Sequence, residues 1–144
     1  MASAALRHAP HADPGLPDFA AEGDRRRLTG AAAKAFRRIV AAWGASNAES
    51  AALLGVSASS WDRIKAERWD GVLNQDQLTR ASALIGVWKG LQLLFADDMA
   101  VRWPQLPNRG PIFAGATPIA AMVAGGIPRM IETRQYIDAL RGGL

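Results

Sequence analysis

Residues 47–67, with the sequence NAESAALLGVSASSWDRIKAE, constrain the fold more than any other stretch of the chain. Two short helical patterns flank Gly55, and a glycine between two such patterns predicts a tight turn. Ala51 is small enough for two helices to cross at it, while Trp61 and Ile64 are spaced by three on one face of the second helix. The stretch therefore predicts a helix-turn-helix.

The second helix of this motif has a polar outer face. Ser57 follows the turn and is placed to cap the first turn of the helix, because its hydroxyl can accept from a free backbone N–H. Asp62 and Glu67 on the same segment repel phosphates, so the helix is only weakly suited to nucleic acid. The candidate DNA-binding residues of this helix are Ser57, Ser59, Ser60, Arg63 and Lys65.

The pattern resembles the DNA-binding helix-turn-helix of Xre/Cro-type repressors. Five positions contribute to the resemblance: Ala51, Gly55, Val56, Trp61 and Ile64. The alternative is an ordinary helical hairpin within a bundle, and the spacing alone leaves both open.

Composition limits the class of protein. The 144 residues are enough for one domain or two small ones, and the formal net charge of +4 with a pI near 10.3 permits an anionic partner without requiring one. The chain has no cysteine, which excludes disulfides and thiolate chemistry and favours a cytoplasmic setting. No apolar run approaches the roughly 20 residues needed to cross a bilayer, and the N-terminus lacks a signal-peptide pattern. We expect no membrane association.

Residues 1–28 are expected to form a flexible N-terminal arm, because prolines are frequent there and apolar periodicity is weak. His8 and His11 are spaced by three, but no third ligand lies nearby, so we expect a solvated tail and no metal site. The arm ends in Arg25, Arg26 and Arg27, which are candidate phosphate contacts. A solvated charged linker is an equal alternative for these arginines.

Residues 29–73 are expected to form the helix-turn-helix domain. An alanine-rich supporting helix is predicted over 29–43, with an apolar stripe that includes Phe36 and Trp43. The third segment, 74–144, begins with a long helix predicted over 75–95. Glycines at Gly86 and Gly90 would weaken an isolated helix, so another backbone is expected to come close there. The broad apolar stripe of this helix predicts both a core position and a dimer seam. The chain as a whole is therefore expected to be all-α.

Beyond the long helix the sequence becomes rich in proline and glycine. A short segment from Asp97 or Asp98 is expected to end at Pro104, and a loop follows. Thr117 and Pro118 predict the start of a helix that stops at Gly125–Gly126. A last amphipathic helix is predicted from Pro128 onward.

This ordered set is similar to the toxin-binding domain of the Xre/MbcA/ParS antitoxin family. With the helix-turn-helix, the resemblance covers residues 29–144, and the closing run 136–143 belongs to it. The positions that define it most clearly are Trp103, Pro107, Asn108, Phe113, Gly115, Thr117, Pro118, Gly125 and Gly126.

The resemblance implies an antitoxin of a type II toxin-antitoxin system. Members of this family bind a RES-domain toxin, an enzyme that consumes NAD, and hold it inactive, and many also repress their own operon. The expected partners are thus a cognate RES-domain toxin, operator DNA and a second copy of the chain in a homodimer or larger assembly. By this likeness the C-terminal region is a toxin-binding domain that covers the entrance to the toxin's nucleotide pocket.

An amphipathic helix that bears arginines can lie in the groove of a partner, and aromatic and arginine side chains dominate interface energies. The candidate toxin-binding residues are Arg129, Met130, Arg134, Tyr136, Arg141 and Leu144. The aliphatic residues Ile131, Ile137 and Leu140 of the same helix are expected to be intramolecular core.

Two other classes of function compete with this one. A stand-alone DNA-binding regulator that only dimerises through its C-terminal half is the main alternative. An enzyme is disfavoured, because the chain has no cysteine, no histidine outside the arm and no glycine-rich phosphate loop, and the adjacent Asp97 and Asp98 are better explained as caps. We expect no catalytic residue and no cofactor.

Overall fold

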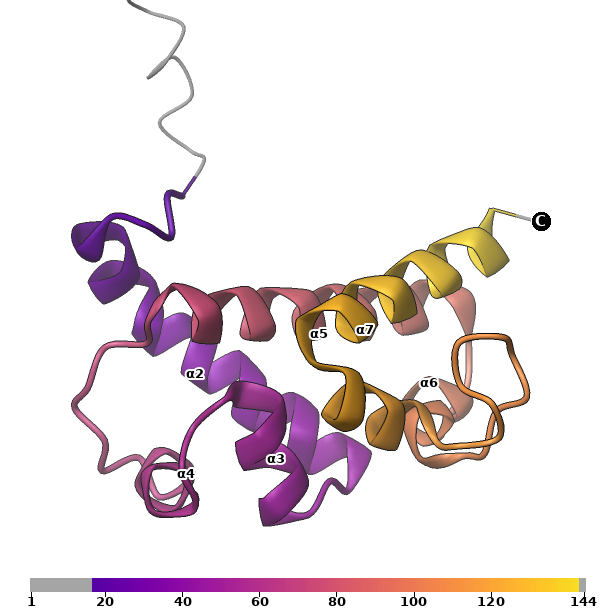
Figure 1. The fold of residues 1–144 in the computed structure, drawn as a ribbon, viewed down its shortest axis with the longest axis horizontal. Coiled ribbons are helices and arrows are strands. Elements are labelled where there is room, and N and C mark those ends of the chain that lie inside the picture. Colours follow the sequence, from indigo (N-terminus) through magenta and orange to yellow (C-terminus); the bar gives the residue numbers. More distant parts are fainter. Residues whose placement is uncertain (1–16, 143–144) are drawn as a thin grey trace, which may run out of the picture.

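A computed structural model describes residues 17–142 and shows an all-helical chain, as predicted; no strand occurs within this range (Figure 1). The elements in chain order are α2 (Glu22–Trp43), α3 (Asn47–Leu54), α4 (Ala58–Lys65), α5 (Gln75–Leu94), α6 (Met99–Arg102), the 3-10 helix η2 (Trp103–Gln105) and α7 (Pro118–Arg141).

Helix α2 supports the helix-turn-helix as expected. Phe36 and Trp43 are buried together with Ile39 and Val40, and Gly44 ends the helix in the left-handed conformation with φ of 69°. The face of α2 that contains these side chains packs on α5, and Phe36 on it contacts Trp61 of α4. Helix α2 therefore supports the other helices of the N-terminal half.

The start of α2 was predicted too late. The helix begins at Glu22, before the expected Thr29, so the arginine run lies in a regular helix and not in an arm or linker. Glu22 and Asp24 favour the positive end of the helix dipole. They also form ion pairs with Arg26 and Arg27, at 3.0 Å each. Such pairs one turn apart stabilise a helix that has no apolar stripe at its start.

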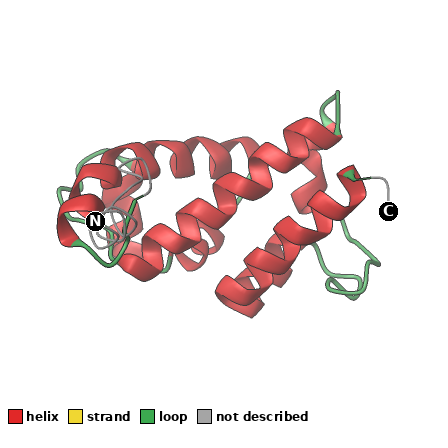
Figure 2. Cartoon of the chain, turned by 90° about the horizontal axis from the view of Figure 1, so that it is seen from above, coloured by secondary structure: helices red, strands yellow, loops and turns green. Residues whose placement is uncertain are grey.

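The long helix α5 is covered by other helices of the same chain. Figures 1 and 2 show α5 and α7 running side by side, and α2 also packs on α5. A Cβ atom built on Gly90 would lie 2.9 Å from Ile137 Cγ2, and one on Gly86 would lie 2.8 Å from the Arg134 side chain. The prediction that another backbone comes close at these glycines is therefore wrong, because side chains of α7 lie nearest to them.

Helix α7 is interrupted where the sequence predicted a break. Gly126 has φ of 66° and ψ of −154°, which is not a helical conformation, and it divides the element into two helical parts. Thr117 caps the first part by accepting from the backbone N–H of Ala120 at 3.1 Å, and Pro118 occupies the first turn.

An aromatic cluster fixes the loop between η2 and α7. Trp103 meets Phe113 edge to face at 5.6 Å between ring centroids, and Tyr136 of α7 packs on both rings. Pro104 lies inside η2 and is buried, so it does not end the segment as predicted. The loop is thereby held against the last helix.

None of the helices in residues 17–142 is long and apolar enough to span a membrane. The same range holds no group of three His, Cys, Asp or Glu side chains that is suited to a metal ion. His8 and His11 lie outside the described residues.

Candidate functional site

The helix-turn-helix has the predicted geometry. Gly55 adopts the left-handed conformation with φ of 77° between α3 and α4, and Ser57 caps α4 by accepting from the Ser60 backbone N–H at 3.1 Å. Trp61 and Ile64 of α4 are buried, and Trp61 packs edge to face on Phe36 of α2 with ring centroids 5.6 Å apart. These contacts fix the orientation of α4, whose opposite face remains exposed.

The exposed face brings together four of the predicted DNA-binding residues. Ser57 and Ser59 are exposed, and their hydroxyl oxygens lie 3.3 Å apart. The Arg63 guanidinium donates to the Ser60 hydroxyl at 3.4 Å, which holds both side chains on one surface. Hydroxyl and guanidinium groups are the donors that contact base edges and phosphates in complexes of this kind of motif.

Lys65, the fifth predicted residue of this helix, reaches away from that face. Its ammonium donates to Asn47 Oδ1 at the start of α3, at 2.9 Å. It lies at a cleft between α2, α3 and α4 together with Arg37 and Arg38. Sequence reasoning missed these two arginines, because only the packing of α2 on α4 places them beside the motif.

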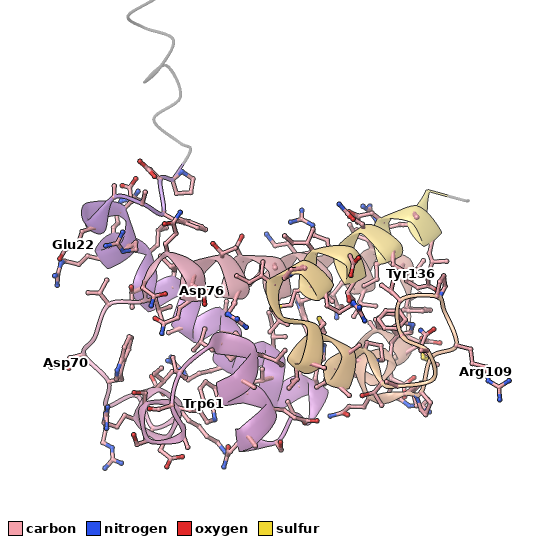
Figure 3. The ribbon with its side chains drawn as sticks, in the orientation of Figure 1. Glu22, Trp61, Asp70, Asp76, Arg109 and Tyr136 are labelled. Atoms are coloured by element: carbon pink, nitrogen blue, oxygen red, sulfur yellow. The ribbon has the colours of Figure 1, made fainter. Side chains whose placement is uncertain are left out.

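The arginine run is not brought to this surface. Arg25 donates to the carbonyl oxygens of Phe19 and Ala20, at 3.0 and 2.8 Å, and so ties down the chain before α2. Phe36 is the residue of α2 on which α4 packs. Arg25 lies about 16 Å before Phe36 along the helix axis, at a rise of 1.5 Å per residue. Figure 3 accordingly shows Glu22 at the upper left of the molecule and Trp61 at the lower left.

A hydrogen-bonded carboxylate organises the same end of α2. The backbone N–H of Asp18 donates to Asp24 Oδ2 at 2.9 Å, and Arg27 donates to Oδ1 at 3.0 Å. These two donors lower the pKa of Asp24, the backbone N–H having the larger effect. The arrangement is that of a stable helix start.

Two predicted toxin-binding residues have structural roles, and for Met130 the prediction is wrong. Met130 is fully buried against the core, so it has no surface to offer a partner. Tyr136 is half-buried in the aromatic cluster. An amphipathic stripe in a sequence does not show whether the chain itself or a partner covers it.

Arg129 also contributes to the fold. Its Nη1 donates to the carbonyl oxygen of Ile112 in the loop at 2.6 Å, and its Nε pairs with Glu132 at 2.8 Å. Arg129 therefore holds the loop on α7 from one side, as Tyr136 does from within.

Arg134 and Arg141 are exposed and are spaced by seven, so they lie on one flank of α7. Arg141 pairs with Asp138 at 3.1 Å, and Leu144 lies outside the described residues. Ile131, three residues before Arg134, is 43% exposed, and Leu140 is 40% exposed; the expectation that both are core is therefore wrong, whereas Ile137 is buried as predicted.

Leu93 of α5 adds to this exposed flank. It is 68% exposed and stands seven residues after Gly86, so it shares the face of α5 that carries Gly86 and meets α7. We call the four exposed residues along this line the α5–α7 seam: Leu93, Ile131, Arg134 and Arg141.

Comparisons with known proteins agree with the first half of this structure. Residues 22–86 match the family model of the antitoxin Xre-like helix-turn-helix domain. An uncharacterized protein of Sinorhizobium fredii, y4oB, is 34% identical over 111 residues, which are 76% of this chain and 84% of that protein. No solved structure matches the chain significantly. The matched range contains α2, α3, α4 and most of α5, and the similarity to y4oB extends over most of both chains. The chain therefore belongs to one family with y4oB, and its residues 22–86 form an antitoxin Xre-like helix-turn-helix domain.

Proposed function

We propose that this chain is the antitoxin of a type II toxin-antitoxin system, which binds and neutralises a RES-domain, NAD-consuming toxin in the cytoplasm and represses its own operon. The observation that supports this most directly is the match of residues 22–86 to an antitoxin helix-turn-helix domain. In the proposed division of roles, the exposed face of α4 contacts operator DNA and the C-terminal half binds the toxin.

The α5–α7 seam is the proposed toxin-binding surface. It combines two exposed aliphatic side chains, Leu93 and Ile131, with two exposed arginines, Arg134 and Arg141. Exposed apolar side chains gathered with arginines are typical of the centre of a protein interface. The seam lies on two packed helices, so little backbone conformational entropy would be lost on binding.

The test is inhibition of NAD consumption by the purified toxin encoded beside this gene. Arg134→Glu and Arg141→Glu together are expected to weaken inhibition by at least about 10-fold. Each reversal places a carboxylate opposite the toxin groups that an arginine would pair with, and like charges at an interface repel. Leu93→Asp is expected to have a similar effect. All three side chains are exposed, so the helix content of the variants should not change.

Val123→Asp is the matched control for Leu93→Asp. Val123 is also an exposed aliphatic residue, at 36%, but it lies in the first part of α7, before the break at Gly126. Wild-type inhibition by the seam variants would contradict this assignment of the surface. A chain that binds its promoter tightly while no toxin is inhibited would instead support the alternative, a stand-alone helix-turn-helix regulator.

A further inference from the structure

We propose that the cleft between α2, α3 and α4 is a phosphate site that holds the backbone of a DNA duplex beside α4. This inference rests on the proposed DNA-binding function and adds residues to it. The cleft has a volume of about 360 Å³. Its polar lining residues are Arg37, Arg38, Asn47, Ser50 and Lys65.

Three cations converge on the cleft from two helices. Arg37 and Arg38 come from the middle of α2, and Lys65 comes from the last turn of α4. Lysine and arginine side chains supply most of the contacts to DNA phosphates. A strand of the duplex that receives α4 in its major groove passes close to the flanks of that helix, where these cations lie.

Two of the cations are held in place by the protein. The Lys65 ammonium donates to Asn47 Oδ1 at 2.9 Å, and Arg37 donates to the carbonyl oxygen of Ile64 at 3.5 Å. The Arg37 side chain is only 23% exposed. Side chains that are already ordered lose less entropy when they bind a ligand.

Arg38 is the cation most available to a ligand. It is exposed and forms neither an ion pair nor a side-chain hydrogen bond with any residue in the described range 17–142. A phosphate could therefore bind the Arg38 guanidinium without first displacing an acceptor of the protein. Arg38 is the residue whose loss should weaken phosphate binding most.

Much of the cleft lining is apolar, and it is supplied by Val40, Ala41, Ala45 and the Trp61 ring. Apolar walls lower the local dielectric, so a charge at the mouth interacts more strongly than it would on an open surface. The cleft is thus better suited to an anion than scattered surface lysines are.

Arg37 also faces a neighbouring cleft, which Glu67 helps to line. Glu67 lies 3.6 Å from Arg37, but its side chain is 74% exposed and is therefore well screened by solvent. This gives a pair of variants with opposite expected effects, Arg38→Gln and Glu67→Gln. The first removes a cation from the cleft, and the second removes the ion-pair partner of Arg37.

The test is fluorescence anisotropy of the full-length protein with two labelled duplexes of equal length, its own promoter and a scrambled sequence, between about 50 and 200 mM salt. Arg38→Gln is expected to lower affinity for both duplexes by the same factor and to reduce the slope of log K against log salt by about one. Glu67→Gln is expected to raise affinity for both duplexes. Lys89→Gln, which removes an exposed cation on α5, is the control and should leave the slope unchanged.

The outcomes separate the phosphate site from the wider function. If the wild-type protein binds neither duplex, the proposed DNA binding fails and the phosphate site fails with it. If Arg63→Gln weakens promoter binding while Arg38→Gln and Glu67→Gln equal the wild type, only the phosphate site is overturned. The phosphate site is likewise overturned if inorganic phosphate shifts the Trp61 indole N–H resonance while neither cleft variant changes DNA affinity, because the cleft is then a small-anion site.

Discussion

Arg80 Nη1 donates to the carbonyl oxygen of Ala52 at 3.4 Å, which joins α5 to the last turn of α3. Its Nε also pairs with Asp76 at 2.8 Å, and the side chain is only 21% exposed. The same side chain packs over the turn, since a Cβ built on Gly55 would lie 3.0 Å from Arg80 Cδ. Arg80 therefore fixes the turn of the helix-turn-helix against the helix on which the C-terminal half packs.

Arg80→Met is expected to lower the free energy of unfolding by about 1 to 2 kcal/mol, because it keeps most of the packing but removes a charged hydrogen-bond donor. Hydrogen exchange should accelerate most at the C-terminal end of α3. The control is Arg102→Met, which removes an exposed ion pair of 3.8 Å to Asp98 and should cost less than about 0.5 kcal/mol. Equal effects of the two variants in urea denaturation would argue against the structural role of Arg80.

Thr29→Val is expected to destabilise the protein by about 1 to 3 kcal/mol. The buried Thr29 hydroxyl accepts from the backbone N–H of Leu73 at 3.1 Å, and valine has the same shape but leaves that N–H without a partner. The Thr79 hydroxyl donates only to the Gln75 carbonyl oxygen one turn earlier in a solvent-exposed position. Thr79→Val should therefore change stability by less than about 0.5 kcal/mol in the same thermal or urea measurement.

Alanine substitutions at the two α5 glycines are expected to have opposite signs. Gly86→Ala should raise stability by up to about 1 kcal/mol, because the Arg134 side chain is exposed and can move away while the helix gains propensity. Gly90→Ala should lower stability by about 1 kcal/mol, because the buried Ile137 side chain cannot move and overpacking outweighs the gain. Calorimetric Tm values that shift in the same direction would contradict the packing of α7 on α5.

Asp24 should make the start of α2 sensitive to acid. The folded-state pKa of Asp24 lies below its unfolded value, because the Asp18 N–H and Arg27 donate to its carboxylate. Its contribution to stability is therefore present above the unfolded pKa and is lost as the pH falls through the folded pKa. A carboxyl carbon NMR titration of Asp24 should show the lowered midpoint, and Asp24→Asn should remove the acid dependence of amide exchange near Asp18. A midpoint at or above the ordinary aspartate value would contradict this arrangement.

Local features of the fold could be predicted from the sequence. Gly55, Ser57 and Thr117 each end or begin a helix as predicted, because a left-handed turn or a side-chain cap depends only on neighbouring residues. The all-α class followed from the same periodicities. Long-range packing was much less accessible.

The errors about which side chains are buried lie where tertiary contacts decide the outcome. Met130 is core, while Ile131 and Leu140 are exposed, because the position of the apolar stripe relative to α5 decides which of these side chains is covered. The cleft with Arg37 and Arg38 is likewise created by three helices meeting, and no local pattern marks it.

Neutralisation of a RES-domain toxin is the proposed function, and it is tested by titrating a candidate RES-domain toxin from the neighbouring gene with the purified protein while NAD consumption is followed. We predict that NAD consumption falls to background at a fixed molar ratio and that both proteins elute together in size-exclusion chromatography. Undiminished NAD consumption at every ratio, with the two proteins eluting separately, would overturn the proposed antitoxin function.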